Sequence, residues 1–329
     1  MTTFVRFITP GGAEEHDPQD LPGLLRSTDG FVWVDVPRAQ DAEEVLRDVL
    51  GLRPAAVRLC LDRNHIPQVQ TFPEHVVLVL LVPERGEAGH VHLLELDQVV
   101  DERAIVTVHG PLNPVVPLEA ALVETAAVWH AIESGRLRPQ SPAELSHAIS
   151  SAVARRQQAF VSGMAGLVAE LEISVMGSDF RKPELLLDEL FLLRHELLVV
   201  RTMAEQSHHV FGRVQALTDQ LPGDAGRYAA DLADQFHRVR SMADGEKDFL
   251  FGVLEFYQSR ISTKMTIASE RLAVLAVLTL PITAIASIYG MNFKHMPELS
   301  QAWAYPATLV VMAAIATMLM RWAKRQGWW

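Results

Sequence analysis

Cysteine is almost absent from the chain, and positive charge is scarce. Cys60 is the only cysteine among 329 residues, which excludes an intrachain disulfide and a metal cluster held by several thiolates. The 40 acidic residues outnumber the 29 lysines and arginines, and the resulting formal net charge of -11 argues against nucleic acid as a partner. Because no lysine follows a glycine, the phosphate-binding loop of nucleotide-driven machines is missing too.

A catalytic constellation is also lacking, since no nucleophile, base and orienting group emerge together. His195-Glu196 begins a zinc-protease pattern, but Val199 stands where the second histidine is required. The sequence therefore predicts a protein that is not an enzyme and that uses no organic cofactor.

Charge is missing altogether from two stretches near the C-terminus. Residues 272–289 and 302–320 are 18 and 19 consecutive residues without a charged side chain. At about 1.5 Å of rise per residue, each is long enough to cross a bilayer as a helix. The sequence predicts a membrane hairpin that follows a long, charged body.

Basic residues around this hairpin predict its orientation in a cell membrane. They flank both outer ends, whereas the connection at 290–301 holds few charges. The flanking residues are Arg260, Lys264, Arg271, Arg321, Lys324 and Arg325. We expect both termini in the cytoplasm, and the first ten residues look like a strand rather than a signal peptide. Trp303 and Tyr305 would mark the outer interface, and Trp322, Trp328 and Trp329 the inner one.

The first part of the chain alternates between strand-like and helical patterns. Strands are expected at 3–9, 31–36, 68–72, 76–82, 93–100 and 104–109, and helices at 41–50 and 54–61. Pro111, Pro114 and Pro117 then interrupt the pattern and predict a subdomain junction.

From residue 118 onward the pattern is helical. Amphipathic helices are expected at 142–176 and 183–221, each with a proline in its first turn, a turn at 177–182 between them and Pro222-Gly223 as the end of the second. A third helix begins near Gly226 and meets no proline before Pro281, so it should run into the first span. The predicted division is a cytoplasmic α/β domain (1–117), a helical domain (118–223), a stalk (224–271), a first span (272–290), an outer loop (291–301), a second span (302–321) and a basic tail (322–329).

Small, hydroxylated or leucine side chains recur along one face of the first span. They stand at steps of three or four residues, which places them on one side of a helix. The stripe consists of Thr266, Ser269, Leu272, Ala276, Leu280, Thr283, Ser287 and Met291, and the opposite face carries Val274, Val277, Leu278, Ile282, Ile285 and Ile288. Such a stripe serves plain helix packing in membranes. It would equally line a wet, uncharged pore, but a single hairpin cannot enclose one, so conduction would require an oligomer.

Gly290-Met291-Asn292 stands where the first span should leave the membrane. One interpretation is a helix stop, because glycine and asparagine tolerate left-handed backbone geometry. The flanking residues favour another interpretation. The runs 289–293 (YGMNF) and 296–299 (MPEL), Tyr305-Pro306 and the basic end 324–328 resemble the CorA family of magnesium channels. More loosely, so do Leu280-Pro281-x-Thr283 upstream, 33–35 (WVD), Asn64-His65-x-Pro67-Gln68-Val69 and residues 184–200.

The resemblance implies a funnel-shaped homopentamer whose stalk helices continue into a central pore. Such a protein conducts Mg²⁺ inward, often with Co²⁺ and Ni²⁺, and is closed by cytoplasmic Mg²⁺. The resemblance also implies that Gly290, Met291 and Asn292 form the selectivity filter and that Glu298 belongs to the outer loop. A ring of neutral amide oxygens from Asn292 could hold a still-hydrated Mg²⁺ without trapping it.

The same resemblance assigns the pore lining and suggests regulatory ligands. The lining would comprise Thr266, Ser269, Leu272, Leu280 and Thr283. Four residues depart from the common pattern of the family. Thr266 stands where many members carry asparagine, and Ser269 where many carry methionine. Glu270 occupies a position that is usually basic, and Ser287 one where glycine is frequent. The segment Tyr228-x-x-Asp231-x-x-Asp234 resembles the part of the stalk that supplies regulatory carboxylates, with Glu84 or Glu87 as the partner. A solvated acidic helix face is the simpler explanation for these carboxylates.

Two other functions stay open. A zinc-transporting relative of the same fold usually has a branched apolar residue at the position of Met291. A membrane-anchored sensor would use the hairpin only as a tether and would form no fivefold assembly.

Overall fold

The computed structural model of the chain describes residues 3–177, 183–216, 225–292 and 296–327. These residues form two compact units, Met1–Val253 and Leu254–Trp329. The first unit contains β1 (Phe4–Thr9), β2 (Gly12–His16), η1 (Pro18–Asp20), α1 (Leu21–Leu24), β3 (Phe31–Val36), η2 (Ala39–Asp41), α2 (Ala42–Glu44), η3 (Val45–Val49), α3 (Pro54–Leu61), β4 (Gln68–Thr71), β5 (Val76–Arg85), η4 (Glu87–Gly89), β6 (Val91–Val100), β7 (Ala104–His109), α4 (Leu118–Ala121), α5 (Val123–Glu133), α6 (Pro142–Met176), α7 (Pro183–Ala216) and the first part of α8 (Ala225–Tyr289).

A seven-stranded mixed sheet organises the first unit. The strand order is β2-β1-β3-β7-β6-β5-β4, and every neighbouring pair is antiparallel except β3 and β7. The parallel pair lies inside the sheet, and both of its strands are buried along their whole length. Their valine-rich sequences suit this position, because a strand covered on both faces needs apolar side chains on each of them.

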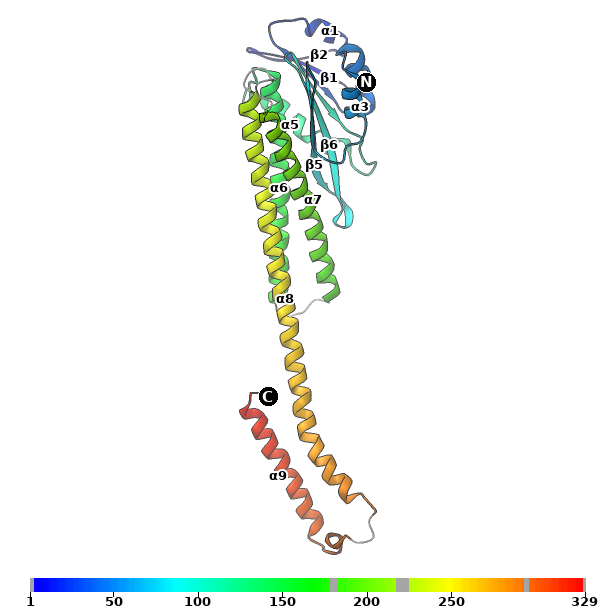
Figure 1. Ribbon diagram of the computed structural model, residues 1–329, viewed down its shortest axis with the longest axis vertical. Coiled ribbons are helices and arrows are strands. Elements are labelled where there is room, and N and C mark those ends of the chain that lie inside the picture. The colour runs from blue at the N-terminus through cyan, green and yellow to red at the C-terminus, as the bar shows by residue number, and fades with distance from the viewer. Residues whose placement is uncertain (1–2, 178–182, 217–224, 293–295, 328–329) are drawn as a thin grey trace. The chain divides into compact units, whose positions relative to one another are not determined.

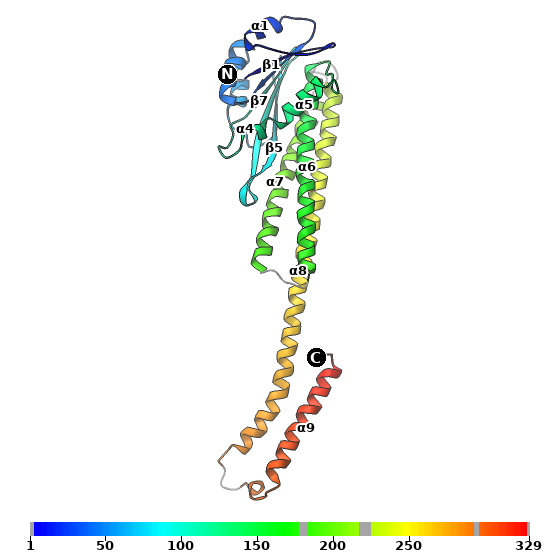
Figure 2. The same ribbon diagram turned by 180° about the vertical axis from the view of Figure 1, so that it is seen from behind.

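Helices cover both faces of this sheet, as Figures 1 and 2 show. One core joins the sheet to α1, α2 and α3 and includes Leu21, Val34 and Cys60. The other joins it to α5, α6, α7 and α8 and includes Trp33 and Phe236. The first unit is therefore a three-layer arrangement in which the sheet lies between two layers of helices.

The start of α6 shows how local sequence fixes a boundary. Pro142 occupies the first turn, where its missing amide hydrogen is not needed. The Ser141 hydroxyl oxygen accepts a hydrogen bond from the Glu144 amide at 3.2 Å, and the Glu144 carboxylate accepts one from the Gln140 amide at 2.8 Å. These reciprocal bonds satisfy amides at the helix start that have no partner within the helix.

The second unit contains the rest of α8, the short η6 (Pro297–Ser300) and α9 (Ala304–Arg325). By length and composition, three helices of the described chain could cross a membrane: α6, α8 and α9. In α6, however, 28% of the most apolar window is buried, against 6% in α8 and in α9. The most apolar window of α6 is thus more buried than those of α8 and α9.

Most sequence-predicted elements are confirmed, and two predictions were wrong. The strands at 31–36 and 104–109 and the helices at 54–61 and 142–176 have the predicted bounds. β2 was missed because it is an exposed edge strand that carries Glu14 and Glu15. The helix expected at 41–50 is broken into the end of η2, α2 and η3.

The junction predicted at Pro111–Pro117 does not separate two cores. Val116 and Val128 share one apolar cluster with strand residues such as Leu80. Residues 178–182 and 217–224, which include the predicted turn and Pro222-Gly223, lie outside the described residues, as do Trp328 and Trp329. The seven-part division of the chain stays a prediction.

Candidate ion pathway and regulatory carboxylates

The predicted stripe of α8 is exposed, and so are most other side chains of this helix between residues 262 and 292. Thr266, Ser269, Leu272, Ala276, Leu280, Thr283 and Ser287 are all exposed in the single chain. Leu272 and Leu280 are the most prominent, with 67% and 66% of their surface accessible. An apolar, uncharged face of this extent on a membrane helix is available for lipid or for further helices.

The opposite side of α8 is covered in part. Val274 is 2% exposed, Leu278, Ile282 and Ile285 are half-buried, and Val277 and Ile288 are exposed.

A cavity lies between the end of α8 and the start of α9. Ile285 and Tyr289 line it from α8, and Ala304 and Thr308 line it from α9. Glu298, in η6, lines the same cavity. The outer-loop carboxylate is therefore placed beside the contact between the two helices.

The Gly290-Met291-Asn292 signature continues the last turn of α8. The Gly290 amide donates to the Ala286 carbonyl at 2.9 Å, and the Met291 amide donates to the Ile288 carbonyl at 3.3 Å. Gly290 does not take up left-handed geometry, so the simple helix-stop interpretation does not explain this glycine. A Cβ atom here would stand 3.2 Å from the Ala286 carbonyl oxygen, which is tight. All three signature residues are exposed, and Phe293, Lys294 and His295 lie outside the described residues.

Hydroxyl groups along α8 are oriented by the helix itself. The Thr266 hydroxyl donates to the Ser262 carbonyl at 3.0 Å. Its proton is thereby used, and the oxygen presents lone pairs outward. This polarity suits the water shell of a cation, whose hydrogen atoms point away from the ion.

Of the proposed regulatory carboxylates, Asp231 is held by two neighbours. The side-chain nitrogens Nε2 of His147 and of Gln235 each lie 2.7 Å from Asp231 Oδ2. The bond from His147 is the main reason why the pKa of Asp231 is lowered. Asp234 lies nearly one turn further along α8 and is exposed.

Glu84 and Glu87 lie at the hairpin between β5 and β6. Glu84 forms an ion pair with Arg156, and Glu87 is exposed at the start of η4. His147 and Arg156 both belong to α6 and are separated by nine residues, or about 14 Å of helix. Among the described residues, no three His, Cys, Asp or Glu side chains form a group that could hold a metal ion.

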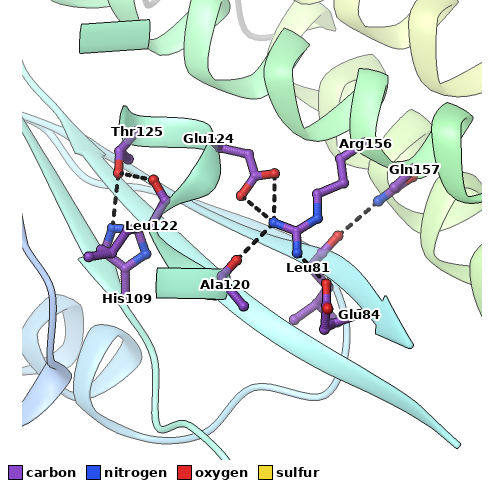
Figure 3. Close-up of polar contacts among 9 residues, drawn as sticks. All are labelled: Leu81, Glu84, His109, Ala120, Leu122, Glu124, Thr125, Arg156 and Gln157. Atoms are coloured by element: carbon purple, nitrogen blue, oxygen red, sulfur yellow. Dashed lines mark hydrogen bonds and ion pairs between the residues drawn. The ribbon is translucent and has the colours of Figure 1, made fainter. Parts of the chain in front are cut away.

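Arg156 is the centre of a network that the sequence did not reveal (Figure 3). Its Nη1 donates to the Ala120 carbonyl at 2.8 Å and to both oxygens of Glu124 at 3.0 and 3.1 Å, while Nη2 binds Glu84. Glu124 is 3% exposed. Burial raises the pKa of Glu124, and Arg156 offsets only part of this rise.

The Asn64-to-Val69 motif has a structural role in the first unit. Asn64 donates from its backbone amide to Glu95 at 2.8 Å and from its side chain to the Leu59 carbonyl at 2.8 Å, and it accepts from Gln68 at 2.7 Å. Asp97, fully buried beside Glu95, has a pKa well above its usual range, because of burial first and the neighbouring carboxylate second. Glu95 thereby anchors the loop after α3 to the sheet.

A sheet-bearing domain is thus joined to two helices, α8 and α9, that are long and apolar enough to cross a membrane. The family model described as "CorA-like Mg2+ transporter protein" matches residues 28–325. The chain belongs to this family.

Two relatives extend this finding. YfjQ of Bacillus subtilis is 24% identical over 306 residues, which cover 91% of this chain and 90% of that protein. The cobalt/magnesium transport protein CorA of Thermotoga maritima is 36% identical over 101 residues, which cover 31% of this chain and 29% of the relative.

Solved structures share the fold. The complete structure of the CorA magnesium transporter from Methanocaldococcus jannaschii matches with a TM-score of 0.81 at 15% identity, over 100% of this chain and 99% of the other. The cytoplasmic domain of ZntB from Vibrio parahaemolyticus matches with a TM-score of 0.61 at 10% identity, over 80% of this chain and 100% of the other. A protein named as a magnesium transporter and one named ZntB both have this fold. The fold alone therefore does not identify the metal ion that the chain transports.

Proposed function

We propose that the chain is one subunit of a homopentameric, passive channel for divalent cations that admits Mg²⁺ through a cell membrane. The observation that carries the proposal is the exposed, uncharged stripe of α8, which leads directly to Gly290, Met291 and Asn292. Five such stripes would surround a wet path, with residues 302–321 as an outer ring and both termini in the cytoplasm. Co²⁺ and Ni²⁺ would share this path.

The membrane potential suffices as a driving force. An inside potential of about -100 mV gives a doubly charged ion roughly 4.6 kcal/mol of inward drive. A site for ATP is therefore unnecessary. Leu272 and Leu280 would form apolar rings that close the path by excluding water.

Replacing Asn292 with alanine tests the proposal. The variant should fail to rescue growth of a strain that lacks magnesium uptake, because the amide oxygens that hold the hydrated ion are gone. Asn113→Ala, at a half-buried position in the loop between β7 and α4, makes the same substitution away from the pathway and should rescue fully. Both variants must reach the membrane in equal amounts. Unchanged rescue by Asn292→Ala would refute the assignment.

Closure by cytoplasmic Mg²⁺ would use carboxylates from neighbouring subunits, with Asp231 and Asp234 on one side and Glu84 or Glu87 on the other. This arrangement is consistent with the lack of a three-ligand cluster among the described residues of one chain. A bound ion would have to compete with His147 for Asp231 and with Arg156 for Glu84.

The two alternatives make different predictions in the same reconstituted system. Zn²⁺ flux far above Mg²⁺ flux would favour a zinc transporter. Monomers or dimers without any conductance would favour a membrane-anchored sensor, and a fivefold assembly in detergent would count against it.

A further inference from the structure

A groove runs along α9 on the side that faces away from α8. Its volume is about 690 Å³. Val310, Ala314 and Arg321 line this groove, whereas Thr308 and Met312 line the cavities between α9 and α8. At about 100° per residue, these two sets lie on roughly opposite sides of the helix. The groove is therefore open to the surroundings of the hairpin and is not covered by α8.

Most of this groove is apolar. Ala314 and Thr317 have short side chains, and the longer Val310 and Met318 beside them are 67% and 74% exposed. The Thr317 hydroxyl donates to a carbonyl of its own helix at 2.7 Å, so its proton is already used. From Val310 to Arg321 the helix rises by about 16 Å, close to the roughly 15 Å of one leaflet of the hydrocarbon core. An apolar groove of this length fits one acyl chain.

The end of the groove nearest the C-terminus is positively charged. Arg321 and Arg325 both line it, and their spacing of four residues places them on the same side of α9. Both are exposed, and neither forms an ion pair within the described part of the chain. Trp322, at the same end, is a residue typical of the lipid headgroup region. Because the last carbonyls of a helix carry partial negative charge, attraction of an anion to this end depends on the arginines.

We propose that this groove binds one anionic phospholipid, with its phosphate between Arg321 and Arg325 and an acyl chain along Ala314 and Thr317. Guanidinium groups bind phosphate oxygens with paired, charge-assisted hydrogen bonds. A zwitterionic lipid adds a positive group that the arginines repel, and a free phosphate compound leaves the apolar part of the groove empty. The inference rests on the proposed crossing of the membrane by α9 with its C-terminus in the cytoplasm, but it does not depend on which ion is transported.

Native mass spectrometry of the full chain in detergent counts individual bound lipids and tests this site. Phosphatidylglycerol should bind about 25-fold more tightly than phosphatidylcholine with the same acyl chains, because each basic residue beside an anionic headgroup contributes about a fivefold gain in affinity. Arg321→Gln/Arg325→Gln should remove this preference. Lys324→Gln removes the same charge as Arg325→Gln one residue away, but Lys324 does not line the groove. It should change the affinity for phosphatidylglycerol by less than about twofold, against about fivefold for Arg325→Gln.

A second variant keeps the test valid if the arginine variants do not reach the membrane. Ala314→Phe fills the groove without changing any charge and should weaken the binding of phosphatidylglycerol by about tenfold, since the loss of about 50 Å² of apolar contact has an effect of that size. Met320→Phe enlarges an exposed side chain of α9 outside the groove and should have no effect.

Several outcomes would overturn the proposal. Equal affinities for the two lipids would do so, and equal losses from Arg325→Gln and Lys324→Gln would show that only the general surface charge attracts the lipid. Displacement of phosphatidylglycerol by an excess of glycerol 3-phosphate would make a free phosphate compound the occupant. A protein that conducts Mg²⁺ without any lipid preference would refute this site alone, whereas an intact preference without conductance would refute the proposed function alone.

Discussion

Replacing Arg156 with methionine should leave a buried carboxylate without its counter-charge. Glu124 is 3% exposed, and its two carboxylate oxygens lie 3.0 and 3.1 Å from the same guanidinium nitrogen of Arg156. Removal of one partner of a buried ion pair typically costs about 3–5 kcal/mol. For a unit of this size, 1 kcal/mol corresponds to about 2–4 °C, so the melting temperature should fall by roughly 6–20 °C.

The pH dependence makes this prediction sharper. Burial already raises the pKa of Glu124 in the folded protein, and loss of Arg156 raises it further. A carboxyl group whose folded pKa is raised contributes full stability at low pH and loses it as the pH rises through that pKa. The difference in melting temperature between wild type and Arg156→Met should therefore be largest near pH 8 and should shrink toward pH 5.

Circular dichroism of the full chain in detergent between pH 5 and pH 8 measures this difference. The double variant Arg156→Met/Glu124→Gln should recover most of the loss, because no buried charge remains. Arg47→Met removes an exposed pair with Glu43 and should leave the melting temperature nearly unchanged. A destabilisation by Arg156→Met that is constant across this pH range would refute the reasoning.

Three further predictions concern other carboxylates and the thiol. The raised pKa of Asp97 means that the folded protein loses stability as the pH rises through that pKa. Asp97→Asn should therefore reduce the fall in melting temperature between pH 5 and pH 9. An equal fall for the variant and the wild type would contradict this. Burial, with Asp97 and Glu95 nearby, raises the pKa of the Cys60 thiol. Iodoacetamide at pH 8 should therefore label Cys60 only in the urea-unfolded chain. Rapid labelling of the folded protein would contradict the buried position of Cys60. Asp231→Ala should shift protease protection to higher Mg²⁺ concentrations, whereas superimposable titrations would remove Asp231 from the regulatory site.

Much of the fold was predictable because it depends on local signals. The helix at 142–176 begins at a serine–proline cap, and the strand at 31–36 is a mostly apolar run bounded by Gly30 and Pro37. β2 gave no such signal, since an exposed edge strand needs no apolar side chains. The two apolar helical stretches near the C-terminus were predictable from the absence of charge alone.

The contacts of the regulatory carboxylates were not predictable. Glu84 and Arg156 are 72 residues apart in sequence, and Asp231 and His147 are 84 apart. Spacing along one element cannot reveal a partner on another, so the sequence suggested these carboxylates but not what holds them. For the same reason, Arg156 and Glu124 showed no pattern of their own.

The placement of His147 and Arg156 on α6 has a mechanical consequence. A helix is stiff along its axis, so one displacement of α6 moves the side chains that bind Asp231 and Glu84 together. Within one subunit, a cation that captures either carboxylate would lower the energy needed to free the other. A double-mutant cycle between Asp231→Ala and Glu84→Ala, read out as Mg²⁺ protection, would then give effects that do not add.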